Sequence, residues 1–361
     1  MSDANRIPCL DGLRGLAALA VMLFHFNYFF LPQARLTAIV PFVSRAYLAV
    51  DLFFLLSGFV MAHVYGSLLA SNWRVHAVQF ARARFARLYP LFAVTTLAMA
   101  IVFALSHTPL PLVSFSDRSL TLQPFLLQQW APGLSWDYPS WSVSTEVEAY
   151  VFFLFCSGLL LGGKHPRLIA AGCIVIVTAL SIAGGGNLNI FVGIPALLRT
   201  LAEFSLGVLL YRAHSAGLGF PLSLVTIASA VFAGLATITH LDFFVVAAFG
   251  GLILYCASDK QRLGKPLNSR PLVALGNWSY SIYLWHAPAH YAVMVALAAI
   301  GYPVMHLGLI SSRFLLLTTA LAVVALSAFH YRYVETPCRR FLTGRRLFNP
   351  PSILTAGPTI G

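Results

Sequence analysis

Long apolar runs separated by short polar segments recur along nearly the whole chain. A helix that crosses the hydrocarbon core of a bilayer needs about 20 mostly apolar residues, and many of these runs reach that length. The pattern therefore predicts an all-α fold, a polytopic membrane bundle of about ten transmembrane helices. The expected spans are 12–30, 47–66, 87–106, 143–161, 168–183, 190–211, 221–239, 243–257, 272–299 and 308–333.

The composition supports a membrane protein and excludes two other classes. The 361 residues are 59% hydrophobic and 9% charged, whereas a soluble domain has about 25% charged residues. The high apolar content also excludes a disordered chain. The run after Arg14 is too long for a cleavable signal peptide and carries no small-residue cleavage site. The five cysteines share no metal-binding spacing, which favours free thiols.

The excess of basic residues indicates orientation in a bilayer. There are 23 Lys and Arg against 11 Asp and Glu, a net charge of +12. The basic residues lie in short clusters between apolar runs and match no nucleic-acid motif, so we expect no nucleic-acid partner. Most of them fall on one side of the predicted spans if the N-terminus is cytoplasmic. This bias predicts that both termini are cytoplasmic.

Two ionisable residues share one face of the first predicted span. His25 follows Arg14 by eleven residues, which is about three helical turns and roughly 16 Å along the axis. His25 is therefore expected near the middle of the membrane, where polar groups usually line a cavity. Histidine is the commonest general base near neutral pH. The alternative is a buried histidine that only bonds to a neighbouring helix.

Two carboxylates are expected inside the bundle. Asp51 opens the second span, and its natural partner is either His25 or an arginine. Beside His25 it would orient a base, whereas beside an arginine it would only tie two helices together. Glu146 and Glu148 open the fourth span and cannot share a helix face. Of these two, Glu146 is expected to face the interior.

Other polar groups mark the third, sixth and ninth spans. Arg84 and Arg87 share a face just before the third span, and their guanidinium groups suit phosphate, although ordinary positive-inside charge is the alternative. Arg199 and Glu203 can pair within the sixth span. The ninth span carries hydroxyl groups and a histidine that do not fit a lipid-facing helix, namely Ser279, Tyr280, Tyr283 and His286.

An aromatic connection is expected on the outer side, over about 107–142. It contains Trp130, Trp136, Tyr138 and Trp141. These rings could anchor a loop at the membrane interface, or they could form a lid or a surface on which a sugar stacks.

Together these motifs resemble the acyltransferase 3 family of membrane acyltransferases, over about residues 5–340. Six short motifs occur in the family's order: Leu10-Asp11-Gly12-Leu13-Arg14-Gly15 with His25, Phe53-Phe54-Leu55-Leu56-Ser57-Gly58-Phe59, Arg84 and Arg87 before Tyr89-Pro90, Trp141-Ser142 leading to Glu146, Ser279-Tyr280-Ser281-Ile282-Tyr283-Leu284-Trp285-His286, and Tyr333-Val334-Glu335-Thr336-Pro337.

The resemblance implies a function as well as a fold. It implies transfer of an acyl group, usually acetyl, from cytoplasmic acyl-CoA to a hydroxyl of a carbohydrate, such as exopolysaccharide or lipopolysaccharide, in the bacterial inner membrane. Arg14 and His25 correspond to the family's essential pair, and Arg84 and Arg87 to its arginine motif. Only a short cytoplasmic tail, 341–361, follows the membrane domain. Without an appended extracytoplasmic domain, lipid-linked or small acceptors or a nascent glycan repeat are expected.

The expected mechanism joins these residues. Arg84, Arg87 and Arg14 bind the donor phosphates, and His25 removes the acceptor proton with help from Asp51 or Glu146. Ser279, Tyr280 or Tyr283 stabilise the oxyanion. The remaining candidates for acceptor binding are Trp141, Ser142 and His286. No metal and no permanently bound cofactor are expected. The alternatives are a covalent acyl-His25 intermediate, a macrolide-like acceptor, and a glycan or lipid transporter.

Overall fold

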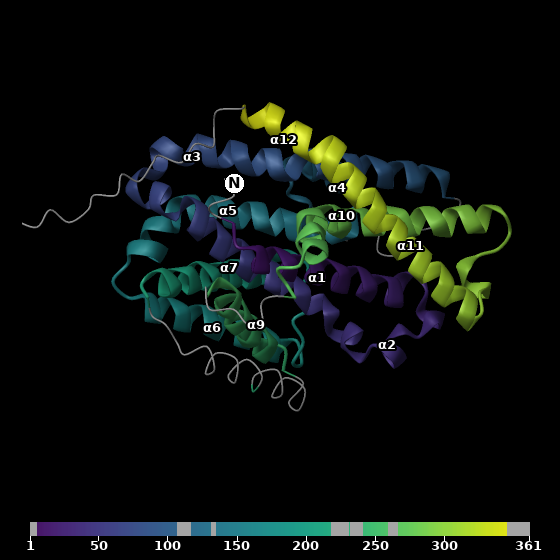
Figure 1. Cartoon of the computed structure of the whole chain (residues 1–361), viewed down its shortest axis with the longest axis horizontal. Coiled ribbons are helices and arrows are strands. Elements are labelled where there is room, and N and C mark those ends of the chain that lie inside the picture. The colour runs from purple at the N-terminus through teal and green to yellow at the C-terminus, as the bar shows by residue number, and fades with distance from the viewer. Residues whose placement is uncertain are drawn as a thin grey trace, which may run out of the picture.

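The protein is a bundle of long helices in a computed structural model (Figure 1). The structure describes residues 6–106, 117–130, 135–217, 231, 241–258 and 266–344. All the regular elements of this part of the chain are helical, which confirms the predicted all-α class. The predicted tail beyond residue 344 and parts of the predicted 107–142 connection lie outside the described residues.

Eight helical stretches are long and apolar enough to cross a membrane. These stretches belong to seven long helices: α1 (Pro8–His25), α3 (Ala49–Leu105), α5 (Trp141–Gly162), α6 (Pro166–Ala183), α7 (Gly193–Ser215), α10 (Arg270–Ala299) and α11 (Leu309–His330). The shorter helices are α2 (Leu36–Ile39), α4 (Asp117–Leu122), α9 (Phe243–Ala257) and α12 (Thr336–Thr343). Single π-helical turns, Phe26–Phe30 and Tyr331–Glu335, extend α1 and α11.

The number of spans differs from the prediction at two places. Helix α9 has 15 residues, which is shorter than the roughly 17–25 residues that cross a bilayer. The predicted span 221–239 falls, apart from residue 231, outside the described residues. The other eight predicted spans correspond to the eight long stretches.

Helix α3 holds two of the predicted spans in one kinked element. The kink lies at Asn72, where φ is −158° and ψ is 88°. Its second half begins there, so Arg84 and Arg87, which were expected just before the third span, lie within the same helical stretch as that span. Arginine and alanine are good helix formers, and the helix therefore continues through the basic segment.

Close contacts between helix backbones fix the positions of the functional side chains. A Cβ on Gly276 of α10 would lie 2.0 Å from the carbonyl oxygen of Asp11 in α1. A Cβ on Gly58 of α3 would lie 1.9 Å from the carbonyl oxygen of Phe204 in α7. Such small residues allow membrane helices to approach closely. The first contact brings Arg14 beside α10, and the second brings Asp51 beside α7.

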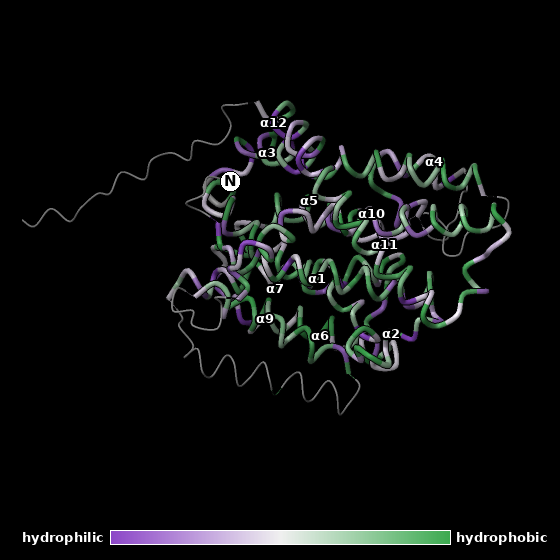
Figure 2. Tube along the Cα trace, turned by 45° about the vertical axis from the view of Figure 1, so that its right-hand side comes forward, coloured by the Kyte–Doolittle hydropathy of each residue, from purple (hydrophilic) through white to green (hydrophobic). Residues whose placement is uncertain are grey.

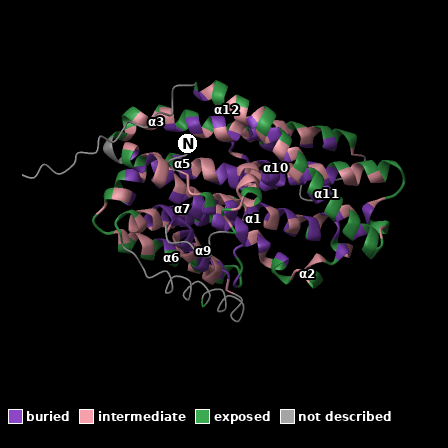
Figure 3. Cartoon of the chain, in the orientation of Figure 1, coloured by how far each residue is buried: buried purple, intermediate pink, exposed green. Residues whose placement is uncertain are grey.

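The outer surface of the bundle is apolar. Hydrophobic residues follow most of the length of the long helices (Figure 2), and buried residues gather in the middle of the bundle, on helices such as α1, α7 and α10 (Figure 3). Outward-facing side chains include Ile310, which is 83% exposed, and Val78, which is 76% exposed. Exposed apolar side chains over a whole bundle suit a lipid environment.

Candidate active site

A cavity of about 610 Å³ lies between α1, α3, α5, α10 and α12. It brings together eight predicted site residues from four helices. Its inner end is closed by Ser142 and Tyr283, whose hydroxyl oxygens lie 2.7 Å apart. The predicted residues that line it are Arg14, Arg84, Arg87, Ser142, Glu146, Ser279, Tyr280 and Tyr283.

The three predicted phosphate-binding arginines face this cavity from two helices. Arg14 contacts Ser279 Oγ at 3.4 Å and lies 3.5 Å from the Asp11 carboxylate. Arg84 donates to the Tyr65 hydroxyl at 3.0 Å, and its guanidinium lies 5.1 Å from the centre of the Tyr65 ring. In the described residues no carboxylate pairs with Arg84. Its charge is therefore available to an anionic ligand.

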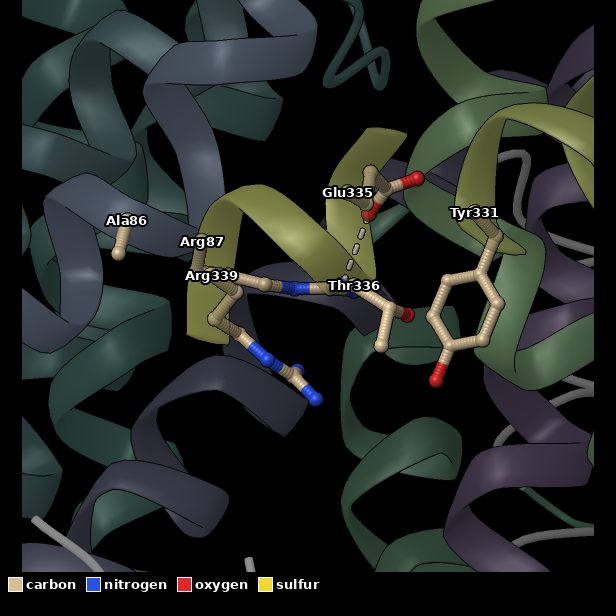
Figure 4. Close-up of a pocket in the computed structure, with 6 residues that line it drawn as sticks. All are labelled: Ala86, Arg87, Tyr331, Glu335, Thr336 and Arg339. Carbon is tan, nitrogen blue, oxygen red and sulfur yellow. Dashed lines mark hydrogen bonds and ion pairs between the residues drawn. The ribbon is translucent and has the colours of Figure 1, made fainter. Parts of the chain in front are cut away.

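Arg87 differs from Arg84 because it is paired. Its Nη1 donates to Glu335 at 3.0 Å (Figure 4). Glu335 is 5% exposed and also accepts a hydrogen bond from Ser281. The π-helical turn Tyr331–Glu335 presents this carboxylate to α3 and α10. The Arg87–Glu335 ion pair thus holds the turn at the end of α11 against α3, beside the cavity.

The sequence analysis missed further charged residues that line the cavity. Arg6 donates to the Asp11 carboxylate at 2.5 Å and to Asn277 Oδ1 at 2.5 Å. Arg339 and Arg340 reach the cavity from α12. These two arginines follow the last apolar run, so they resembled ordinary cytoplasmic charge. The sequence beyond residue 333 could have been interpreted as a continuation of the last helix, which would have placed Arg339 and Arg340 on that helix.

Glu146 is the carboxylate at the inner half of the cavity. Its Oε1 accepts hydrogen bonds from Ser57 at 2.8 Å and from Tyr150 at 2.5 Å. Glu148 points elsewhere and accepts from Trp130 Nε1 at 2.6 Å. Of the two neighbouring glutamates, Glu146 thus faces the cavity and Glu148 faces the segment before α5.

His25 lies in a cluster of rings behind the cavity. Its ring stacks on His286 with 4.9 Å between the centroids and 15° between the planes. Tyr138 packs edge-on against His25 at 4.9 Å, and the Tyr283 ring lies 6.0 Å from His286. Neither histidine belongs to the residues that line the cavity. His25 was expected to line a cavity, but the cavity ends at Ser142 and Tyr283 and does not reach its ring.

Asp51 is not a partner of His25. Its two carboxylate oxygens accept from Arg199 Nε and Nη2 at 2.9 and 2.6 Å. Glu203 lies 3.7 Å from the same guanidinium. A carboxylate buried away from water is destabilised unless a cation pairs with it. The packing of α3 against α7 places Arg199 beside Asp51 and so provides that cation. Of the two predicted partners, the structure selects the arginine.

Trp141 belongs to this buried ion pair and not to the cavity wall. The Arg199 guanidinium lies 5.8 Å from the Trp141 ring and 6.0 Å from the Phe54 ring. Such contacts are typical cation–π interactions. The Trp141 ring thus lies against Arg199, and its part in acceptor binding stays a prediction.

Three hydroxyl groups of α10 are engaged with protein groups. Ser279 donates to the Gly276 carbonyl at 2.9 Å, Tyr280 to the Leu88 carbonyl at 2.8 Å, and Tyr283 to the Pro139 carbonyl at 2.9 Å. Their protons are therefore directed at backbone oxygens. An oxyanion could use them only after a side chain rotates.

Comparison with known proteins identifies the family. The model of the acyltransferase 3 family, described as an acyltransferase domain, matches residues 7–332. The acyltransferase MdmB of Streptomyces mycarofaciens is 32% identical, over 94% of this chain and 94% of that protein. The O-acetyltransferase OatA of Staphylococcus aureus is 22% identical over 94% of this chain, which spans 58% of OatA. No solved structure matches the chain.

The family match covers α1, α3, α5 and α10, which line most of the cavity, and ends before α12. The chain belongs to the acyltransferase 3 family and is a polytopic membrane acyltransferase.

Proposed function

We propose that this protein is a membrane O-acyltransferase that moves an acyl group, most simply acetyl, from acyl-CoA to a hydroxyl of a carbohydrate acceptor. The observation that carries this proposal is the cavity itself, which is lined by six arginines and by hydroxyl groups that include Ser142 and Tyr283. Six guanidiniums against the carboxylates of Asp11 and Glu146, and of Glu335 paired with Arg87, leave an excess of positive charge for the phosphates of CoA.

The orientation of the site follows from its charge. The arginine-rich mouth is lined by both Arg6 and Gly344, which are the two ends of the described chain. Basic residues favour the cytoplasmic side of a membrane. We place the mouth in the cytoplasm, with both termini beside it, in the cytoplasmic membrane of a bacterium. Acyl-CoA then reaches the site from the compartment in which it is made.

The reaction would take place at the inner end of the cavity. The thioester lies beside Ser142 and Tyr283, and the acceptor hydroxyl lies on the side of His25. A rotation of the Tyr283 side chain connects the donor cavity with the space beside His25. His25 takes the hydroxyl proton as the acceptor oxygen forms its bond to the thioester carbon. The carbon–sulfur bond breaks, and the departing thiolate receives that proton from His25.

Two residues have supporting roles in this mechanism. Glu146 accepts hydrogen bonds from Ser57 and Tyr150 and orients the cavity wall on which the pantetheine arm rests. His286 stacks on His25 and fixes the plane of its ring. Positioning the two substrates supplies much of the rate enhancement, and general-base catalysis contributes about 10²–10⁴-fold.

The test uses purified protein in proteoliposomes with [¹⁴C]acetyl-CoA. Fractionated glycans, lipid-linked sugars and hydroxylated small metabolites of the macrolide type are supplied in parallel as acceptors. We expect alkali-labile label in a carbohydrate fraction and none with His25→Ala. Movement of a glycan across the bilayer without ester formation would instead indicate a transporter. If only the small metabolites become labelled, the acceptor is a macrolide-like metabolite and not a carbohydrate.

A further inference from the structure

Helix α12 follows the last spanning helix and lies across the mouth of the cavity. The family match ends at residue 332, before α12 begins at Thr336. Helix α12 packs on α3 (Figure 1), and Arg82 of α3 donates a hydrogen bond to the Leu342 carbonyl. The π-helical turn before α12 is held by the Glu335 pair with Arg87. The helix is thus fastened at both ends.

One side of α12 faces the cavity and the other faces outward. Arg339, Arg340, Thr343 and Gly344 all line the cavity. Phe341, between them in sequence, is 85% exposed. The helix therefore contributes two guanidiniums to the mouth of the cavity while an apolar ring points away from it.

These two guanidiniums are not neutralised by the protein. Among the described residues, neither Arg339 nor Arg340 forms an ion pair, whereas Arg87 pairs with Glu335. Figure 4 shows the Arg339 guanidinium pointing away from the Arg87–Glu335 pair. Like charges placed close together repel unless an anion lies between them. The mouth is therefore built for an anionic ligand.

The arginines differ in how exposed they are, and this order indicates which phosphate of the donor each of them binds. Arg340 is exposed, Arg339 is half-buried, and the Nε of Arg84 is buried. Acyl-CoA carries a diphosphate next to the pantetheine arm and a separate phosphate on the ribose 3′ position. With the thioester at the inner end of the cavity, the 3′-phosphate is the outermost charged group of the donor.

We propose that α12 is a strap over the donor site and that Arg339 and Arg340 bind the 3′-phosphate of acyl-CoA. The proposal rests on the proposed function, because it takes acyl-CoA as the donor. A guanidinium fork matches a phosphate in two hydrogen bonds, so two arginines on one turn can hold one phosphate. Arg84, deeper in the cavity, is left for the diphosphate.

The experiment measures binding of acetyl-CoA and of acetyl-3′-dephospho-CoA to the full-length protein in nanodiscs of neutral lipid. The variants are Arg339→Gln with Arg340→Gln, and the matched control Arg332→Gln. Arg332 is exposed on the preceding π-helical turn and does not line the cavity. Melting temperatures verify that each variant is folded.

We expect the double variant to bind acetyl-CoA roughly tenfold or more weakly and acetyl-3′-dephospho-CoA as the wild type does. The control variant should behave as wild type with both ligands. An equal loss for both ligands, or no loss for either, would overturn the assignment of the 3′-phosphate. If the wild type binds neither ligand, acyl-CoA is not the donor, and the proposed function fails together with this inference.

A second arm separates the donor phosphate from a lipid headgroup. The same measurements are made in nanodiscs that contain phosphatidylglycerol. If Arg339 and Arg340 hold the donor, the loss in affinity persists in both lipid mixtures. A difference between wild type and double variant that appears only with phosphatidylglycerol would assign these arginines to an anionic lipid and overturn the proposal.

Discussion

The imidazole ring of His25 lies nearly parallel to that of His286, with 4.9 Å between the ring centroids and 15° between the planes. Two positive charges at this distance in a weakly polar interior repel strongly. Each ring therefore opposes the presence of a positive charge on the other. A base that must release its proton in each turnover gains from such a neighbour, because the neighbour opposes a second proton in the cluster.

The first prediction concerns this pair. His25→Ala should lower turnover at least about 10²-fold, since it removes the proposed general base. His286→Phe retains a flat ring against His25 and should lower turnover less. The measurement is the steady-state rate of acetyl transfer at saturating acetyl-CoA, with the melting temperature as a control for folding. Equal losses of turnover in the two variants would contradict the proposal that His25 is the base and that His286 only positions its ring.

The second prediction separates Arg84 from Arg87. Arg84→Gln removes an unpaired cation and should raise the KM for acetyl-CoA without lowering stability. Arg87→Gln leaves the buried Glu335 without its cation and should also cost about 1–3 kcal/mol of stability. Adding Glu335→Gln to Arg87→Gln should restore part of the melting temperature. A normal melting temperature for Arg87→Gln alone would show that this ion pair is not structural.

The third prediction concerns Asp51, whose carboxylate pairs with Arg199 and not with His25. Asp51→Asn leaves Arg199 buried beside Glu203 alone, and breaking a buried ion pair by removing one partner costs about 3–5 kcal/mol. We expect a lower melting temperature and less folded protein in the membrane, with near-normal turnover per folded molecule. A large loss of turnover at normal stability would return Asp51 to the role of orienting the base.

The sequence was sufficient to predict eight of the membrane spans but not to say which side chains of different spans pair with one another. The apolar runs fix the length of a helix such as α5, because a bilayer core demands a minimum length. Arg84 and Arg87 were expected before the third span because charge marks the membrane surface, yet the helix begins at Asn72 and includes both residues. Asp51 and Arg199 are 148 residues apart, and the sequence alone offers many cations for this carboxylate.

Helix contacts decide which predicted residues share the cavity. Arg14 meets Ser279 over 265 residues of chain because Gly276 lets α1 and α10 touch. His25 was expected to open onto the donor route, since it shares a helix face with Arg14. The π-helical turn that follows it and the rings of His286 and Tyr138 instead surround it. Periodicity gives the face of a helix but not what packs against that face.

The fourth prediction tests the carboxylate of the cavity. Glu146→Gln keeps the shape of the side chain and can still accept a hydrogen bond from Ser57 or Tyr150. Loss of its charge should therefore lower turnover moderately, and Glu146→Ala should lower it further. Glu148→Gln is the matched control, because that side chain bonds to Trp130 away from the cavity. Equal effects of Glu146→Gln and Glu148→Gln would contradict a role for Glu146 in the cavity.

The last prediction concerns the backbone contact that positions Arg14. In Gly276→Ala, the added Cβ would lie 2.0 Å from the Asp11 carbonyl oxygen, far inside contact distance, so α1 and α10 must separate. Such overpacking typically costs 1–3 kcal/mol or more, and the displaced Asp11 and Arg14 should weaken donor binding as well. Gly172→Ala on α6 is the control, because nothing lies within 4 Å of its added Cβ, and alanine favours a helix. We therefore expect a lower melting temperature and a higher KM for acetyl-CoA in Gly276→Ala only. If both variants melt like wild type, the close crossing of α1 and α10 does not hold the site together.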